Sequence, residues 1–227
     1  MVPPIMKAQL TPVLLVSLAL TCFTSTIRAD NSASAAGADP QLTKAERAKA
    51  VKLLKDSEAR TLGVLEKLTD EQLKFKPAPD KWSVLEVAEH LTLAEGAIFG
   101  GVQKAIDAGV NPGWEAKTKG KSEFLEQAVL DRSHKVQAPE TLVPTGKLSR
   151  QEVMEKFKQE RAETLKFAAK TRLPLKSYTF DHPAPVIGTL NAYQWLLLVG
   201  LHNMRHNLQI DEVMANPNFP KSTAKSD

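Results

Sequence analysis

The chain has 227 residues, which is enough for one domain with a sizeable core. It is 42% hydrophobic and 25% charged with a formal net charge of +4, a composition typical of a globular protein. Lysine and arginine are interleaved with glutamate and aspartate along helical patterns, which indicates solvated helix faces and excludes a basic surface for nucleic acid. We therefore expect no nucleic-acid partner.

Residues 1–29 have the pattern of a secretory signal peptide. Lys7 supplies a positive start, and residues 12–23 form an uncharged apolar run that is too short for a membrane span. Cleavage after Ala29 would place the protein in the periplasm or another extracytoplasmic compartment, with membrane contact only through the signal peptide. The alternative is a lipoprotein processed at Cys22, although the preceding Ala-Leu-Thr is a poor lipobox.

Cys22 is the single cysteine, so a chain without the signal peptide has no disulfide, no thiolate ligand and no cysteine nucleophile. Residues 30–40 are rich in small residues and predict a flexible linker. Residues 41–216 are expected to form a helical domain, and residues 217–227 a frayed C-terminal tail.

Helical periodicity follows the linker. Thr43 and Glu46 form a capping box at the start of a first helix of roughly seven turns. Ser83 and Glu86 form a second box, and the helix that follows carries an apolar stripe as far as residue 106. The two prolines of residues 75–80 exclude a regular helix between them.

Residues 109–147 are broken by prolines and glycines and predict a long connection, with a short helix over residues 122–130. A third helix is expected to begin after Ser149 and to end near Thr171. Residues 178–187 contain two prolines and are predicted to be extended or irregular.

The final helix, expected after Gly188 and Thr189, contains the most informative pattern. His202 and His206 are four residues apart, so they lie on one face of a helix, on an apolar stripe. Imidazoles on such a stripe need polar partners inside the protein, and a metal ion is one candidate. His90, beside the stripe of the second helix, is a candidate third ligand, although a histidine in that position alone is more often part of the core.

Three segments match the motifs of a known family. They are KWSVLEVAEHL from residue 81, DHPAPVIGTLNAYQWL from residue 181 and LHNMRHNLQI from residue 201, in order within residues 42–215. Together they resemble the DinB-like family. The resemblance implies an all-α four-helix bundle, here with a long connection between helices two and three. It also implies a divalent metal ion on three histidines, which fall on His90, His202 and His206. The histidine of the second segment is not usually a ligand in the family, so His182 is expected only at the rim of a pocket.

Three neutral imidazoles would leave the full charge of the ion available to activate a bound water or thiol. Glu86 and Gln209 are candidates to orient the rings, the alternative being a capping role and a solvated side chain, respectively. Asn203 and Arg205 flank the pair and are expected at the surface. Zinc or nickel is the expected ion. The competing hypothesis is three buried histidines bonded to the backbone without a metal.

Relatives implied by the resemblance include bacillithiol transferases and mycothiol-dependent maleylpyruvate isomerases. A metal-dependent thiol S-transferase or hydrolase acting on a small molecule is therefore one hypothesis, and export weighs against a cytosolic thiol as substrate. No catalytic residue besides the metal ligands is evident. The alternative is a non-enzymatic metal-binding or stress-associated helical bundle, in one version a homodimer through one helix face. A helical protein-interaction module is the third alternative, and it would need a large exposed apolar patch.

Overall fold

The computed structural model of this protein describes residues 38–134 and 136–221. The expected signal peptide and the linker as far as residue 37 lie outside the described residues, as do residues 222–227 of the expected tail. Within the described ranges, no helix is both long and apolar enough to cross a membrane.

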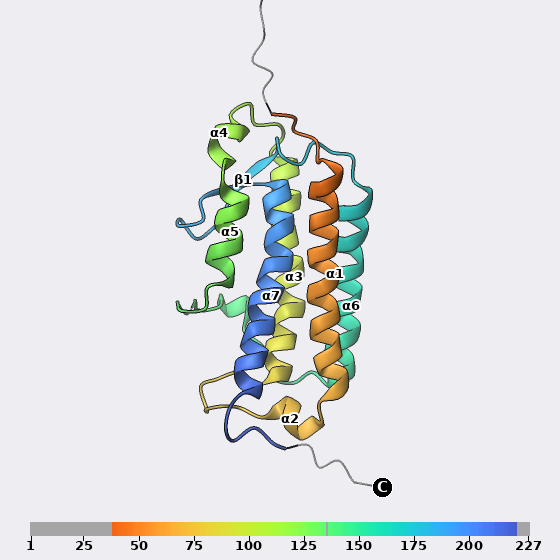
Figure 1. The fold of residues 1–227 in the computed structure, drawn as a ribbon, viewed down its shortest axis with the longest axis vertical. Coiled ribbons are helices and arrows are strands. Elements are labelled where there is room, and N and C mark those ends of the chain that lie inside the picture. The colour runs from red at the N-terminus through yellow and green to blue at the C-terminus, as the bar shows by residue number, and fades with distance from the viewer. Residues whose placement is uncertain (1–37, 135, 222–227) are drawn as a thin grey trace, which may run out of the picture. The chain divides into compact units, whose positions relative to one another are not determined.

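Most of the described residues are helical. The helices are α1 (Lys44–Lys67), α2 (Asp70–Lys74), α3 (Val84–Asp107), α4 (Trp114–Thr118), α5 (Lys121–Leu130), the 3-10 helix η1 (Glu140–Leu142), α6 (Arg150–Lys170) and α7 (Ala192–Met214). The strands are β1 (Thr179–Asp181) and β2 (Thr189–Asn191). The long helices α1, α3, α6 and α7 lie side by side, which confirms the predicted all-α four-helix bundle (Figure 1).

Local chemistry fixes where the long helices begin. Thr43, Ser83 and Ser149 cap α1, α3 and α6, each accepting from the backbone three residues on while the glutamate there accepts from the cap residue. These are the predicted starts. The last helix begins later than expected, at Ala192, because Asn191 and Gln194 form its capping box.

The residues before α7 form a small antiparallel hairpin that the sequence analysis did not anticipate. Strands β1 and β2 pair with Thr179 opposite Asn191 and Asp181 opposite Thr189. Each strand has three residues, which is too short for a recognisable alternation of apolar and polar side chains.

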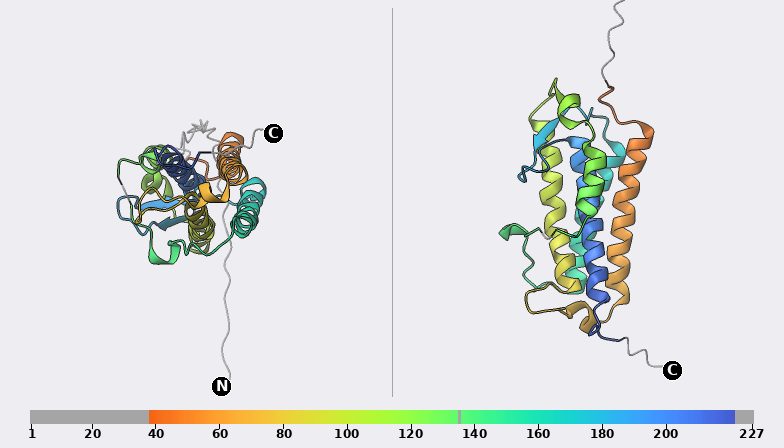
Figure 2. Two further views of the ribbon diagram at one scale, coloured as in Figure 1. Left: turned by 90° about the horizontal axis from the view of Figure 1, so that it is seen from below. Right: turned by 60° about the vertical axis from the view of Figure 1, so that its left-hand side comes forward.

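Helices α1 and α7 run in the same direction, and α3 and α6 run opposite to them (Figure 1 and Figure 2). The hydroxyl of Tyr193 at the start of α7 donates to the carbonyl of Glu46 at the start of α1, over 3.3 Å. Residues 108–149 return the chain from the end of α3 to the start of α6, which is the predicted long connection. Its helix α5 packs along α7 (Figure 2).

Two glycines let α7 approach its neighbours closely. A Cβ at Gly101 of α3 would lie 2.3 Å from the ring of Trp195, and a Cβ at Gly200 of α7 would lie 2.6 Å from the side chain of Leu53. Larger side chains there would hold α7 away from α3 and α1. The close contact between α3 and α7 is the one that positions the candidate site.

The core consists of two apolar clusters separated by a polar layer. One cluster contains Leu54, Trp195 and Leu201, and the other contains Leu65 and Ile210. Between them lie buried polar side chains from all four bundle helices, namely Ser57, Thr61, Glu95, Arg161, Asn203 and Asn207.

Candidate metal centre

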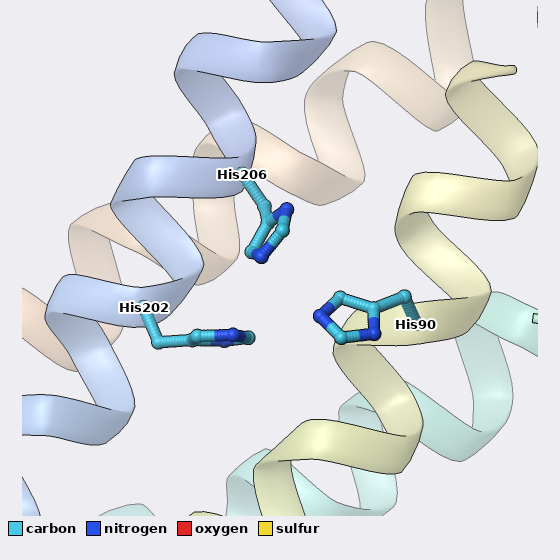
Figure 3. Close-up of side chains that lie close together, drawn as sticks. All are labelled: His90, His202 and His206. Carbon is cyan, nitrogen blue, oxygen red and sulfur yellow. The ribbon is translucent and has the colours of Figure 1, made fainter. Parts of the chain in front are cut away.

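Three histidines meet between α3 and α7 (Figure 3). His90 points from α3 toward His202 and His206, which lie one turn apart on α7. The ring centroids are 5.2 Å apart for His90 and His202, and 4.5 Å apart for the other two pairs. One nitrogen from each ring can be chosen so that all three lie within 4.8 Å of one another. The arrangement is thus compatible with a shared metal ion.

Hydrogen bonds set the orientation of two of the rings. Nδ1 of His90 lies 2.7 Å from the carbonyl oxygen of Leu142, which can only accept, so this nitrogen carries the proton. Nδ1 of His206 lies 2.8 Å from Oε1 of Gln209 and donates to it in the same way. Both rings therefore keep the lone pair of Nε2, the nitrogen that a metal ion would use.

Burial keeps the three imidazoles neutral. Desolvation lowers the pKa of His90, against a smaller opposing effect of its bond to Leu142. Burial and then the neighbouring His206 lower the pKa of His202 well below its ordinary value. For His206, burial and then His90 lower the pKa to about 3. Neutral imidazole is the form that binds a metal, so the group is suited to a cation at neutral pH.

Metal-free protein should lose stability as the pH falls below about 6.5, the ordinary pKa of histidine. The folded-state pKa values of the three rings lie lower, so the unfolded chain binds more protons in this range. The free energy of unfolding therefore decreases as the pH is lowered from about 6.5 to about 3, which is the folded-state pKa of His206. Urea unfolding with a chelator, at about pH 7 and about pH 5, will measure this difference. His206→Gln should reduce it, and an equal difference in that variant would contradict the argument.

The charged groups whose fields reach the rings are cationic. Arg205 lowers the pKa of His202, and Arg132 and Arg205 lower that of His206. Arg132 also binds Glu212 through two contacts of 2.5 and 2.6 Å. Among the described residues, the charged side chains that shift the pKa values of the three rings are thus arginines and not carboxylates.

Trp82 covers one side of the group. Its ring lies 4.9 Å from that of His90 and 6.5 Å from that of His206, nearly parallel to the latter. Trp82 directly precedes Ser83, the cap residue of α3. The structure shows that the indole shields two candidate ligands, which makes its fluorescence a natural reporter of the site.

The segment 142–146, here named the strap, is held against α3 beside His90. The buried carboxylate of Glu89 accepts from the backbone and hydroxyl of Thr145, at 2.8 and 2.7 Å, and from the backbone of Gly146, at 2.9 Å. Glu89 therefore fixes the strap that carries the carbonyl of Leu142. Sequence reasoning missed this residue because its partners are 56 and 57 positions away.

The other predicted site residues separate into two groups. Gln209 contacts His206, as proposed for a residue that orients a ring. Glu86 instead accepts from the backbone of Ser83 and binds Lys76, both at 2.8 Å, so it has the alternative capping role. His182 lies in the turn between β1 and β2.

His182 accepts from the backbone of Ala184 at 3.0 Å and stacks on Trp195 at 5.1 Å. Trp195 precedes His202 by seven residues, about 10 Å along a helix, so His182 does not join the group. It remains a prediction that this ring lies at the rim of a substrate pocket.

The expected surface position is wrong for Asn203, whereas Arg205 is partly exposed. Asn203 is 1% exposed, because it faces α1 and α6 rather than solvent. Arg205 is half-buried and donates to the backbone carbonyls of Val129, Asp131 and His134 at the end of α5. Both positions depend on neighbours distant in sequence, which the periodicity of one helix does not reveal.

Gln209→Ala should weaken metal binding about 10- to 100-fold, the range typical for residues that orient a ligand. The amide fixes the proton on Nδ1 of His206, and its loss frees the ring to rotate away. Zinc titration by calorimetry will measure the change. Gln151→Ala, an exposed glutamine on α6, is the control and should leave affinity unchanged. Equal affinities in the two variants would remove the orienting role.

A helical bundle with a partly buried three-histidine group defines a class of bundle proteins suited to binding a divalent metal. Comparison with known families then identifies the superfamily. The profile of the DinB superfamily matches residues 53–210, and the chain belongs to this superfamily.

One curated protein and one solved structure are also similar to this chain. The uncharacterized protein YuaE of Bacillus subtilis (strain 168) is 28% identical over 163 residues, covering 71% of this chain and 94% of YuaE. The solved structure of YfiT from Bacillus subtilis is similar at 14% identity with a TM-score of 0.49, covering 76% of this chain and 88% of YfiT. YfiT is described as a probable metal-dependent hydrolase with an unusual four-helix bundle topology.

Proposed function

We propose that this protein is a metal-dependent enzyme, a hydrolase or a thiol S-transferase, with its ion on His90, His202 and His206. The supporting observation is the convergence of three ring nitrogens within 4.8 Å, with Nδ1 of two rings occupied by oxygen partners. Zinc or nickel is the proposed ion, since imidazole suits both.

Several features of the site favour catalysis over non-enzymatic metal binding. His202 and His206 are not fully buried, which favours access of a small molecule to the group. A divalent ion on three neutral ligands supplies Lewis acidity, which lowers the pKa of a coordinated water or thiol. Leu142 and Gln209 orient the rings, and Trp82 excludes water from one side. The non-enzymatic metal-binding bundle is the alternative.

The compartment and the partners complete the proposal. A signal peptide over residues 1–29 would export the protein, and an exported enzyme meets few cytosolic thiols, which favours hydrolysis. The proposed substrate is a small molecule, and the proposed membrane contact is limited to the signal peptide. A homodimer through one helix face stays a prediction for size measurements in solution.

The test is activity with matched metal analysis. Zinc-loaded protein is screened against small esters, amides and thiol-transfer substrates, beside His90→Ala and the exposed loop variant His134→Ala. We expect turnover of at least one substrate class in the wild type and in His134→Ala, with loss in His90→Ala. Tight zinc binding without turnover of any class would support the non-enzymatic alternative.

A further inference from the structure

Two asparagines follow the two α7 histidines by one residue each, in the order His202, Asn203, His206, Asn207. Successive residues of an α-helix point about 100° apart, so the histidines and the asparagines form two neighbouring stripes. The histidine stripe faces His90. The asparagine stripe faces the other side of the bundle, and both amides are 1% exposed.

The asparagine amides are joined to α1 by a hydroxyl. Nδ2 of Asn203 donates to Oγ1 of Thr61 at 2.9 Å, and that hydroxyl donates to Oδ1 of Asn207 at 2.8 Å. Nδ2 of Asn207 donates to the backbone carbonyl of Ser57 at 3.1 Å. These contacts tie one stripe of α7 to two turns of its parallel neighbour.

The same network reaches the remaining bundle helices through a buried guanidinium. Arg161 of α6 donates to Oδ1 of Asn203 at 3.2 Å and to both carboxylate oxygens of Glu95 in α3, each at 2.7 Å. It also donates to Oγ of Ser57 at 2.9 Å. All four long helices thus meet in one polar layer.

Such a polar layer favours one arrangement of the helices. Apolar side chains tolerate sliding, whereas buried polar groups lose their hydrogen-bond partners when a helix turns or shifts.

The arrangement of α7 matters because metal ligation tolerates little displacement. Turning a helix by about 20° moves side-chain atoms at a radius of roughly 5–6 Å by about 2 Å. Ligand distances in metal sites are held within about 0.2 Å. A turn of this size would separate His202 and His206 from His90, whose ring is only 5.2 and 4.5 Å away.

We infer that Asn203 and Asn207 are positioning residues for the histidine group: their buried amides set the rotation of α7 so that His202 and His206 face His90. The inference rests on the proposed metal site. It assigns a role to the asparagine stripe of α7, whose hydrogen bonds described above go to α1 and α6 and not to the three rings.

Asn207→Leu is the variant that tests this role. Leucine has the same branching and the same number of side-chain heavy atoms, and the hydroxyl of Thr61 keeps a second acceptor, the carbonyl of Ser57 at 3.1 Å. Thr61→Val, on α1, removes the hydroxyl that joins the two amides and keeps the side-chain shape. Val213→Ala, a buried position of α7 in the apolar cluster, is the control for a simple loss of stability.

Zinc chloride titration by calorimetry, well below the melting temperature, measures the effect. Asn207→Leu should weaken zinc binding about 10- to 100-fold and Thr61→Val about 10-fold, as for residues that orient ligands. Val213→Ala should change it by less than about threefold, since it lies outside the network. Circular dichroism should show unchanged helicity in all three.

Nuclear Overhauser contacts between the rings of His90 and His206 in metal-free protein provide a readout without zinc. They should weaken in Asn207→Leu and persist in Val213→Ala. Unchanged zinc affinity and unchanged ring contacts in both Asn207→Leu and Thr61→Val would overturn the positioning role. A wild type that binds no zinc would instead reject the proposed function, and the ring contacts would then decide the positioning role alone.

Discussion

His202→Ala should reduce metal content from about one divalent ion per chain to nearly none. The substitution removes one of three candidate ligands and leaves two, too few for a stable protein site. Residues that only orient ligands contribute about 10- to 100-fold in affinity, so losing a ligand should exceed about 100-fold. Elemental analysis after dialysis, with zinc and nickel each supplied, measures the occupancy.

Two other histidines provide controls for that experiment. His134 is exposed in the loop after α5, and His182 stacks on Trp195 in the turn between the strands. Alanine at either position should leave occupancy unchanged. Full occupancy in His202→Ala would remove the three-histidine assignment and restore the hypothesis of buried histidines without a metal.

Glu95→Ala should destabilise the protein by about 3–5 kcal/mol, the range for breaking a buried ion pair from one side. Arg161 is 0% exposed, and Glu95 is its bidentate partner at 2.7 Å. Without this carboxylate, the buried guanidinium loses its bidentate charged partner, and the other carboxylate that interacts with it, Glu58, is only partly buried. Chemical unfolding at neutral pH measures the change.

Two further variants test whether the loss of stability comes from an unpaired buried charge or simply from removing a glutamate. Glu163→Ala removes a carboxylate from an exposed pair with Lys166 and should change stability by less than about 0.5 kcal/mol. Replacing Glu95 and Arg161 together by methionine should recover most of the loss, because no charge is then left unpaired. A Glu95→Ala variant within about 1 kcal/mol of the wild type would show that the buried pair contributes little.

The bundle could be predicted from sequence because its signals are local. Thr43, Ser83 and Ser149 cap helices through residues three positions away, and the structure begins α1, α3 and α6 there. Helix α4 carried no such signal, since its cap residue Gly113 has no side chain to bind the first turn. The start of α7 was misplaced although Asn191 and Gln194 form a box of the same kind.

In the candidate site too, the features that could be predicted are local and those that could not depend on residues distant in sequence. The spacing of His202 and His206 places them on one helix face. His90 lies more than 100 positions away from both, so no local pattern links it to them, and it was assigned to the group through the family resemblance. The bond of Gln209 to His206 is local and was anticipated. The burial of Asn203 was not, since it depends on α1 and α6 packing around it.

The parallel pairing of α1 and α7 has a consequence for how the chain folds. Thr61 and Asn207 are in contact although they are 146 positions apart. Bundles whose neighbours follow one another along the chain fold in microseconds to milliseconds, because little loop entropy is lost before contacts form. Here the first and last long helices must find each other across nearly the whole domain. We expect slower folding than in an up-and-down bundle of equal size, and a rate that rises in a circular permutant joining α7 to α1.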